Sequence, residues 1–151
     1  MEVTKIPRRI LSKKIKEIAT EAIKSGEYAE MVLNMKQTMK EHEGVGLAAN
    51  QIGEDASVFV IDAELAHKHN VPDTYFNPEI TEYSSDNDYL EEGCLSIPGF
   101  YVEIKRSKKI MFKAVDEQGR KVKFKAKGFL ARVLQHETDH LNGVVIKDRA
   151  K

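Results

Sequence analysis

The chain has 151 residues and a mass of 17.1 kDa, a length that suits one domain with a buried core. Its 24 basic and 24 acidic residues balance, which argues against binding nucleic acid through bulk charge. No apolar run is long enough to cross a bilayer, and the single cysteine excludes an internal disulfide and fits a reducing compartment. Because no targeting signal is recognisable at the N-terminus, we expect a globular cytoplasmic protein.

Helices are predicted in the first third of the chain. Apolar residues at helical spacing predict one helix over residues 11–24, which Ser25-Gly26 would close. Residues 27–40 carry a second apolar face, whose methionines are typical of a core. Between residues 44 and 53 the sequence is rich in glycine and other small residues, which favours a loop over a regular element.

The middle of the chain favours strands. Pro78 would interrupt its strand or place it at the edge of a sheet. Residues 67–73 are predicted to form a polar loop, residues 84–88 a turn, and residues 116–119 the turn of a hairpin. The predicted strands cover residues 57–61, 75–80, 102–115 and 121–125.

The last predicted element is a helix over about residues 128–142, which Gly143 would end. Helices therefore flank a strand-rich middle. The sequence shows no composition break, linker or repeat. We predict one α+β domain over residues 1–151.

The sharpest local signal is His136-Glu137-Thr138-Asp139-His140, within that last helix. Residues four apart lie on the same helix face, so His136 and His140 can direct two imidazoles at one metal ion. Glu137 lies beside the first of them, where its carboxylate can reach water bound to the ion. The alternative is a helix face with two solvated histidines.

A catalytic divalent ion usually takes three protein ligands and leaves a position open for water. Cys94, in the turn-like segment 91–98, is the best candidate for the third ligand, whereas His42, His67 and His69 are more typical of a surface. A thiolate with two imidazoles suits a borderline-soft ion such as zinc or ferrous iron. A small buried hydrophobic residue is the alternative interpretation of the cysteine.

Three motifs together resemble those of the peptide deformylase family. Residues 44–51 fit G-x-G-x-A-A-x-Q, residues 92–96 read E-G-C-L-S, and residues 136–140 fit H-E-x-x-H, in the family's order. The likeness extends from about residue 27 to about residue 146. This resemblance, rather than composition or periodicity, indicates the substrate.

The resemblance implies an enzyme that removes the formyl group from N-formylmethionine at the start of new polypeptides. Its metal ligands would be Cys94, His136 and His140, the set already reached from the residues alone. Glu137 would take a proton from metal-bound water and then protonate the leaving amine. The family commonly uses ferrous iron, and zinc, nickel or cobalt fit the same ligands.

Further roles follow from the same resemblance. The side-chain amide of Gln51 would donate a hydrogen bond to the developing oxyanion, jointly with the backbone N–H of Leu95. Gly44 and Gly46 would let an extended peptide pair with the loop like an added strand. The apolar slot for the methionine side chain would be formed by residues that a core explains equally well, namely Val45, Leu90, Phe129 and Val133.

The sequence departs from the family pattern at Tyr101 and after Gly143, and these departures affect the substrate preference and ribosome docking. Many bacterial relatives have an arginine, thought to steer the peptide, where this chain has Tyr101, so the preference beyond formylmethionine is not fixed. The chain after Gly143 lacks the long helix of one family branch, so ribosome docking through such a helix is not expected.

Asp139 is expected to partner a ligating imidazole or Arg106, and Glu92 to pair with Arg106 and brace the cysteine turn.

The family likeness implies an α+β fold in which small mixed or antiparallel sheets pack around a central metal-binding helix, with helices at the N-terminus. The expected partners are N-formylmethionyl nascent chains, including those at the ribosome. We expect a monomer with no membrane and no direct nucleic-acid contact. Another H-E-x-x-H hydrolase, such as a peptidase, would need a third His or Glu beyond His140. A non-catalytic metal-binding domain would need a fourth protein ligand.

Overall fold

The structure is a computed structural model and describes residues 2–150. Its helices are α1 (Thr20–Lys24), α2 (Ala29–Glu41), α3 (Ala63–Lys68), α4 (Gly128–Leu141) and α5 (Ile146–Arg149), with the short 3-10 helices η1 (Arg9–Leu11) and η2 (Ala49–Ile52). Its strands are β1 (Gly46–Ala48), β2 (Val58–Ile61), β3 (Thr74–Tyr83), β4 (Asn87–Cys94), β5 (Ile97–Ser107), β6 (Lys109–Val115) and β7 (Lys121–Lys127).

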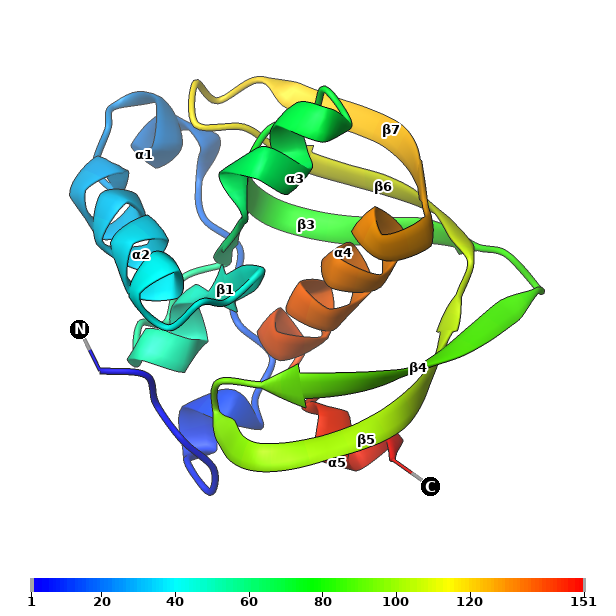
Figure 1. Cartoon of the computed structure of the whole chain (residues 1–151). Helices are drawn as coiled ribbons and strands as arrows, with labels where there is room; N and C mark the ends of the chain where they lie inside the picture. The colour runs from blue at the N-terminus through cyan, green and yellow to red at the C-terminus, as the bar shows by residue number, and fades with distance from the viewer. Residues whose placement is uncertain (1, 151) are drawn as a thin grey trace.

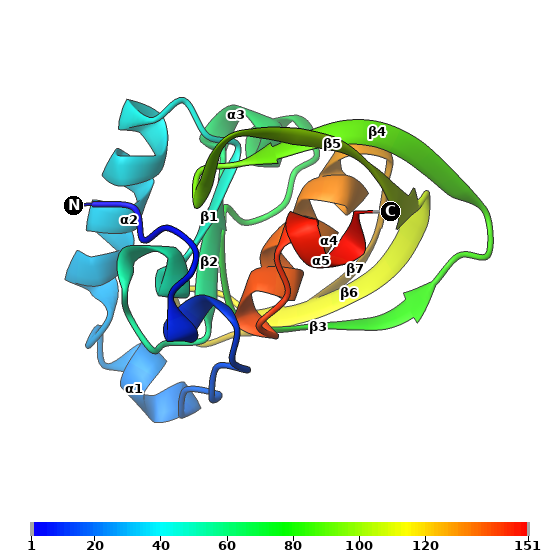
Figure 2. The same ribbon diagram turned by 90° about the horizontal axis from the view of Figure 1, so that it is seen from below.

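Two antiparallel sheets enclose the central helix α4 (Figure 1). One sheet has five strands in the order β1-β2-β3-β6-β7, and the other is the β4–β5 hairpin. Seen from below, α4 lies between the hairpin and the strands β3, β6 and β7 (Figure 2). The predicted α+β class, with small sheets around a central helix, is confirmed.

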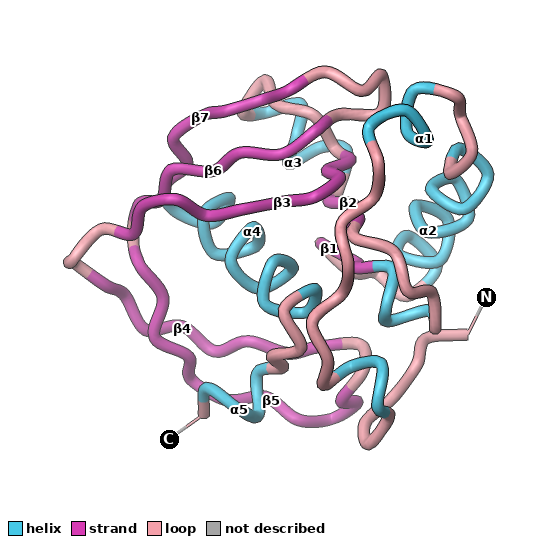
Figure 3. Tube along the Cα trace, turned by 180° about the vertical axis from the view of Figure 1, so that it is seen from behind, coloured by secondary structure: helices cyan, strands magenta, loops and turns pink. Residues whose placement is uncertain are grey.

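The periodicity of the sequence explains why α4 is central. Its apolar residues Leu130, Val133 and Leu134 pack on the inner face of the five-stranded sheet, together with the aromatic rings of Phe59 and Phe112. Strand alternation supplies that inner face, because every second residue of β6 and β7 points inward. Of the residues between them, the lysines are exposed on the outer face, whereas Met111 and Val115 are half-buried; Figure 3 shows the two strands from this side.

The helix predicted over residues 11–24 is wrong. Only η1 and α1 form there, and the chain between them is extended along the protein. The backbone N–H of Ile15 donates to the carbonyl of Leu141, and both backbone groups of Ile18 bond to the side chain of Asn77. These distant partners replace the helical hydrogen bonds, while Ile15 and Ile18 are still buried.

The strand predictions are correct in part. The strand containing Pro78 is interrupted by a register shift, as expected, but β3 is an interior strand between β2 and β6 rather than an edge. The long strand predicted over residues 102–115 is broken at Lys108 into β5 and β6. The sequence interpretation missed β4 and α3, which occupies the start of the expected polar loop. The loop expected over residues 44–53 is also wrong in part, because β1 and η2 form there. Within residues 2–150 no helix has the length and apolar character to cross a membrane.

Candidate metal centre and active site

The helix α4 presents its two histidines one turn apart on the face turned toward the β4–β5 hairpin. Their ring centroids are 5.0 Å apart, and their Nε2 atoms are 3.3 Å apart. His140 is fully buried, and its backbone carbonyl accepts a hydrogen bond of 2.6 Å from the side chain of Asn50. The helical spacing expected from the sequence therefore brings both imidazoles to one point.

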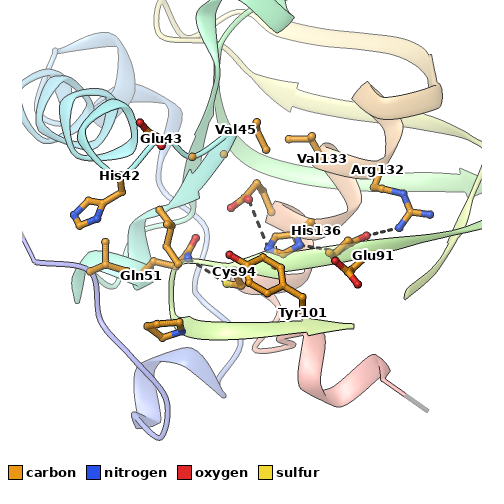
Figure 4. A pocket seen from close by; sticks show the side chains of 18 of the residues that line it. His42, Glu43, Val45, Gln51, Glu91, Cys94, Tyr101, Arg132, Val133 and His136 are labelled. Carbon is orange, nitrogen blue, oxygen red and sulfur yellow. Dashed lines mark hydrogen bonds and ion pairs between the residues drawn. The ribbon is translucent and has the colours of Figure 1, made fainter. Parts of the chain in front are cut away.

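Cys94 reaches the same point from the end of β4. A register shift between Gly93 and Cys94 places Cys94 opposite Ile97, and a bulge of this kind redirects a side chain. Its Sγ atom lies 3.2 Å from Nε2 of His140. The ligand atoms of Cys94, His136 and His140 all lie within 4.8 Å of one another. Figure 4 shows Cys94 and His136 side by side at the pocket.

A buried carboxylate orients His136. Oε1 of Glu92 lies 2.9 Å from Nδ1 of His136, and Glu92 also accepts hydrogen bonds from both Arg106 and Arg132. Burial alone would raise the pKa of Glu92, but the hydrogen bonds from His136 and Arg106 outweigh it and hold the pKa well below its usual range. An ionised carboxylate only accepts, so Nδ1 of His136 carries a proton, and Nε2 is the ring nitrogen left to face a metal ion.

Arg106 is held by two carboxylates at once, which answers a question that the sequence left open. Its Nε and Nη2 atoms donate to Glu92 at 3.0 Å each, and Nη1 donates to Asp139 at 2.5 Å. Asp139 also accepts hydrogen bonds from Arg149. Asp139 therefore partners arginines, and Glu92 pairs with Arg106 as expected.

Glu137 lies beside the ligands with its carboxylate buried against the glycine loop. Oε2 is 3.9 Å from Nε2 of His136, and Oε1 is buried with no hydrogen-bond partner among residues 2–150. Burial raises the pKa of Glu137 to about 7. A Cβ atom at Gly46 would lie 2.6 Å from Oε2, so glycine is required there for close approach.

The side chain of Gln51 faces the metal ligands from η2. Its Oε1 accepts a hydrogen bond of 3.0 Å from the N–H of Ala48, which turns Nε2 toward Cys94 Sγ at 3.6 Å and Ser96 Oγ at 3.2 Å. Leu95 follows the cysteine in the hairpin turn, and its N–H donates to no other group within residues 2–150. Both donors that the sequence singled out therefore border the same centre.

These residues form the floor of a cavity of about 620 Å³. Three of the apolar residues expected to hold the substrate side chain are half exposed at its rim rather than in the core: Val45 at 46%, Leu90 at 49% and Phe129 at 52%. Val133 lines the cavity from below and is buried. The cavity is also lined by Gly44, Gly46, Gln51, Cys94, Leu95, His136 and Glu137.

The chemistry of the centre fits a bound cation. A thiol and two imidazole nitrogens converge there, and all three donate electron pairs. Burial would lower the pKa of His136, but hydrogen bonding to Cys94 and Glu92 raises it to about 10. Burial and the neighbouring charge of His136 hold the pKa of His140 well below its usual range. The two opposite shifts mean that a proton is retained on His136 and that a second positive charge on His140 is disfavoured.

Comparison with known proteins gives the family. A model of the polypeptide deformylase family matches residues 1–151. The chain belongs to the peptide deformylase family. A peptide deformylase from Dictyoglomus turgidum is 48% identical over 153 residues, covering 99% of this chain and 92% of that relative.

Solved structures agree with this assignment. A crystal structure of the Thermotoga maritima peptide deformylase has a TM-score of 0.89 at 38% identity, covering 99% of this chain and 97% of that one. The peptide deformylase of Synechococcus elongatus, solved in complex with actinonin, has a TM-score of 0.90 at 37% identity, covering 100% and 79%. The resemblance inferred from three motifs is confirmed, and the chain is a metal-dependent hydrolase of this family.

The peptide deformylase motifs did not reveal the whole site. The ring of Tyr101 packs on Gly93, where a Cβ atom would lie 2.4 Å from the ring, and it borders the cavity (Figure 4). Arg132 also borders the cavity while its guanidinium bonds to Glu92 and Asp88. The sequence did contain a signal for Arg132, because an arginine among the apolar residues of a predicted helix indicates a buried charge that needs a partner. His42 and Lys5 complete the mouth and carry no such signal.

Proposed function

We propose that residues 1–151 act as one catalytic domain that hydrolyses the formyl amide of N-formylmethionyl nascent peptides and releases formate. The observation that carries this proposal is the convergence of Cys94, His136 and His140 beside the buried carboxylate of Glu137, on the floor of an apolar-rimmed cavity. A formyl group that enters the cavity would lie beside the three metal ligands, the carboxylate of Glu137, and the N–H donors of Gln51 and Leu95.

Cys94, His136 and His140 would hold one divalent ion, with ferrous iron as the native metal and zinc, nickel or cobalt as alternatives. Such an ion supplies a lowered water pKa near neutrality and polarisation of the formyl carbonyl. The hydrogen bond between Glu92 and His136 keeps the Nε2 lone pair of His136 directed at the centre.

Glu137 moves the proton. Its carboxylate, whose Oε2 lies 3.9 Å from Nε2 of His136, accepts a proton from the attacking water, whose oxygen forms a bond to the formyl carbon. The same carboxyl then gives that proton to the amine nitrogen as the carbon–nitrogen bond breaks and formate leaves. Burial favours the neutral form of Glu137, so the protonated intermediate state is accessible near neutral pH.

Gln51 and Leu95 stabilise the charge that develops on the formyl oxygen. The amide oxygen of Gln51 is fixed by Ala48, which holds its Nε2 at the centre, where the weak contact with Cys94 Sγ would be exchanged for one with the formyl oxygen. The N–H of Leu95 is available for the same oxygen. Loss of one such donor typically removes about 3–4 kcal/mol of transition-state stabilisation.

The methionine side chain fits the apolar rim of Val45, Leu90 and Phe129, with Val133 beneath it. Gly44 and Gly46 leave the loop backbone open to an extended peptide. Tyr101 lies at the mouth of the cavity and would contact the residue that follows methionine. We place the enzyme in the cytoplasm as a monomer that meets nascent chains at the ribosome.

The test is formate release from a short formyl-Met peptide by protein purified without oxygen, beside Glu137→Gln. We expect the variant to bind metal at the parental stoichiometry and to lose roughly a hundredfold or more in kcat. Metal content is measured on the same samples as the control. If the metal-loaded parent releases no formate, the proposed function fails for this chain.

A further inference from the structure

The outer face of the β6–β7 hairpin is a ladder of lysines, which we call the lysine face. Alternate residues of both strands point outward, and all the lysines among them are exposed. Figure 3 shows these two strands from the side that faces away from α4. The lysine face consists of Lys109 and Lys113 on β6 and Lys121, Lys123, Lys125 and Lys127 on β7.

The register places like charges directly opposite one another. Lys109 pairs with Lys127, and Lys113 pairs with Lys123. Like charges at directly opposed positions of an antiparallel pair destabilise the sheet. The sequence therefore keeps an unfavourable arrangement on this face.

Few acids compensate these lysines. Two acids of β3 lie on the same face: Glu79, which pairs with Lys113 at 3.5 Å, and Glu82, which lies opposite Met111. Within residues 2–150 the other lysines of the face form no ion pair. The chain as a whole has equal numbers of basic and acidic residues, so the face is a local concentration of positive charge. The balanced net charge argued against nucleic-acid binding, but it does not reveal that lysines are concentrated on this one face.

Protection of a sheet edge explains only part of the ladder. Lysines on an edge strand prevent pairing with another chain, and β7 is such an edge. Lys109 and Lys113, however, lie on β6, which is paired on both sides by β3 and β7. These two residues create the opposed pairs without guarding any free edge.

We propose that the lysine face binds the phosphate backbone of RNA. Same-face lysines recur about 7 Å apart along a strand, which suits a repeating polyanion better than one small anion. Phosphates between opposed lysines would relieve their repulsion. The chain deformylates nascent polypeptides, and RNA is the polyanion present where such chains are made. Membrane-surface binding would need apolar residues as well, and on β6 only the half-buried Met111 lies between the lysines.

The placement allows RNA and peptide to bind together. The lysine face lies on the outer side of the sheet, whereas α4 and the cavity lie on its inner side (Figure 2). No aromatic side chain points outward from β6 or β7, so the contact is to phosphates and does not read bases.

The test measures binding of fluorescein-labelled oligouridine by anisotropy over a range of potassium chloride. The variant Lys123→Gln/Lys127→Gln removes one lysine of each opposed pair, and Lys14→Gln/Lys16→Gln removes the same charge from another exposed segment. We expect the first variant to bind more weakly and to lower the slope of log affinity against log salt by about 1.4, the value for two lost phosphate contacts on a single strand. The second variant should match the parent.

An absence of oligouridine binding at low salt, or equal weakening in both variants, would overturn the proposal. Binding to phosphatidylglycerol vesicles or polyglutamate that exceeds binding to oligouridine would also overturn it in favour of those partners. The first variant should have a higher thermal midpoint, because it relieves the repulsion, and an unchanged midpoint would contradict that argument. Formate release from a short peptide is measured separately, so failure of RNA binding is distinct from failure of the proposed function.

Discussion

The charges beneath His136 and the charges of the lysine face are arranged in opposite ways. Glu92 has a side-chain exposure of 7%, and it accepts hydrogen bonds from His136 and two arginines, so each buried charge meets its opposite. The lysines face each other and water. Because an unpaired buried charge is highly unfavourable, the buried cluster must be complete, whereas solvent tolerates the incomplete one. The buried charges therefore position ligands, and the exposed ones remain available to a partner.

The largest effect is expected from Glu92→Gln. The substitution leaves Arg106 and Arg132 buried without their shared negative charge, which we expect to destabilise the metal-free protein by on the order of 3–5 kcal/mol. Urea unfolding measures this change. The matched variant is Glu79→Gln, which breaks the exposed pair with Lys113 and should change stability by about 0–1 kcal/mol. Equal losses of unfolding free energy in the two variants would contradict the difference between the buried charges under His136 and the exposed charges of the lysine face.

A smaller effect is expected from Gly46→Ala, which tests how closely a buried carboxylate must be placed. The new methyl group would overlap Oε2 of Glu137 and displace it, which we expect to lower kcat on the order of 100-fold in a folded, metal-loaded enzyme. Steady-state kinetics measures it. Gly44→Ala is the comparison, since the tightest contact of its methyl group is with the flexible end of Leu95 at 3.1 Å, and it should leave kcat much closer to the parent. A parental kcat for Gly46→Ala would show that Glu137 has room to move.

The smallest of these effects is expected from Arg132→Met, which removes one of the two arginines on Glu92 while Arg106 remains. Loss of a group that orients a metal ligand's partner typically weakens metal binding about 10–100-fold. Chelator competition with Co²⁺, followed by its absorption spectrum, measures the affinity. Arg149→Met removes an arginine from Asp139, remote from His136, and should leave Co²⁺ affinity at the parental value. If both variants weaken binding alike, Arg132 has no special role in orienting His136.

The metal ligands were predictable because local rules place them. Helical spacing sets His136 beside His140, and the lone cysteine left few alternatives for a third ligand. The helix over residues 11–24 failed for a non-local reason. Ile15 and Ile18 have helical spacing, but their backbone groups bond to Leu141 and Asn77, which lie far along the chain.

The ion cluster under His136 was predictable only in part, for the same reason. Arg132 lies on α4, and its partner Glu92 lies 40 residues earlier on β4, a strand with so many polar residues that no apolar alternation marked it. Pairing with β5 fixes the position of β4. The sequence therefore indicated Glu92 and Arg106 as neighbours but not Arg132, which joins them only once the hairpin has docked on α4.

The bulge beside Cys94 imposes a rule on the length of the chain. Only Leu95 and Ser96 separate Cys94 from its partner Ile97, so adding or deleting one residue here would turn the sulfur away from the imidazoles. At the opposite end of the hairpin, residues 84–86 lead into β4 far from the ligands, and their hydrogen bonds to Lys108 and Lys109 hold the turn rather than the metal centre. A change of length there would disturb that turn, whereas the cysteine turn should keep a constant length among variants that retain the metal.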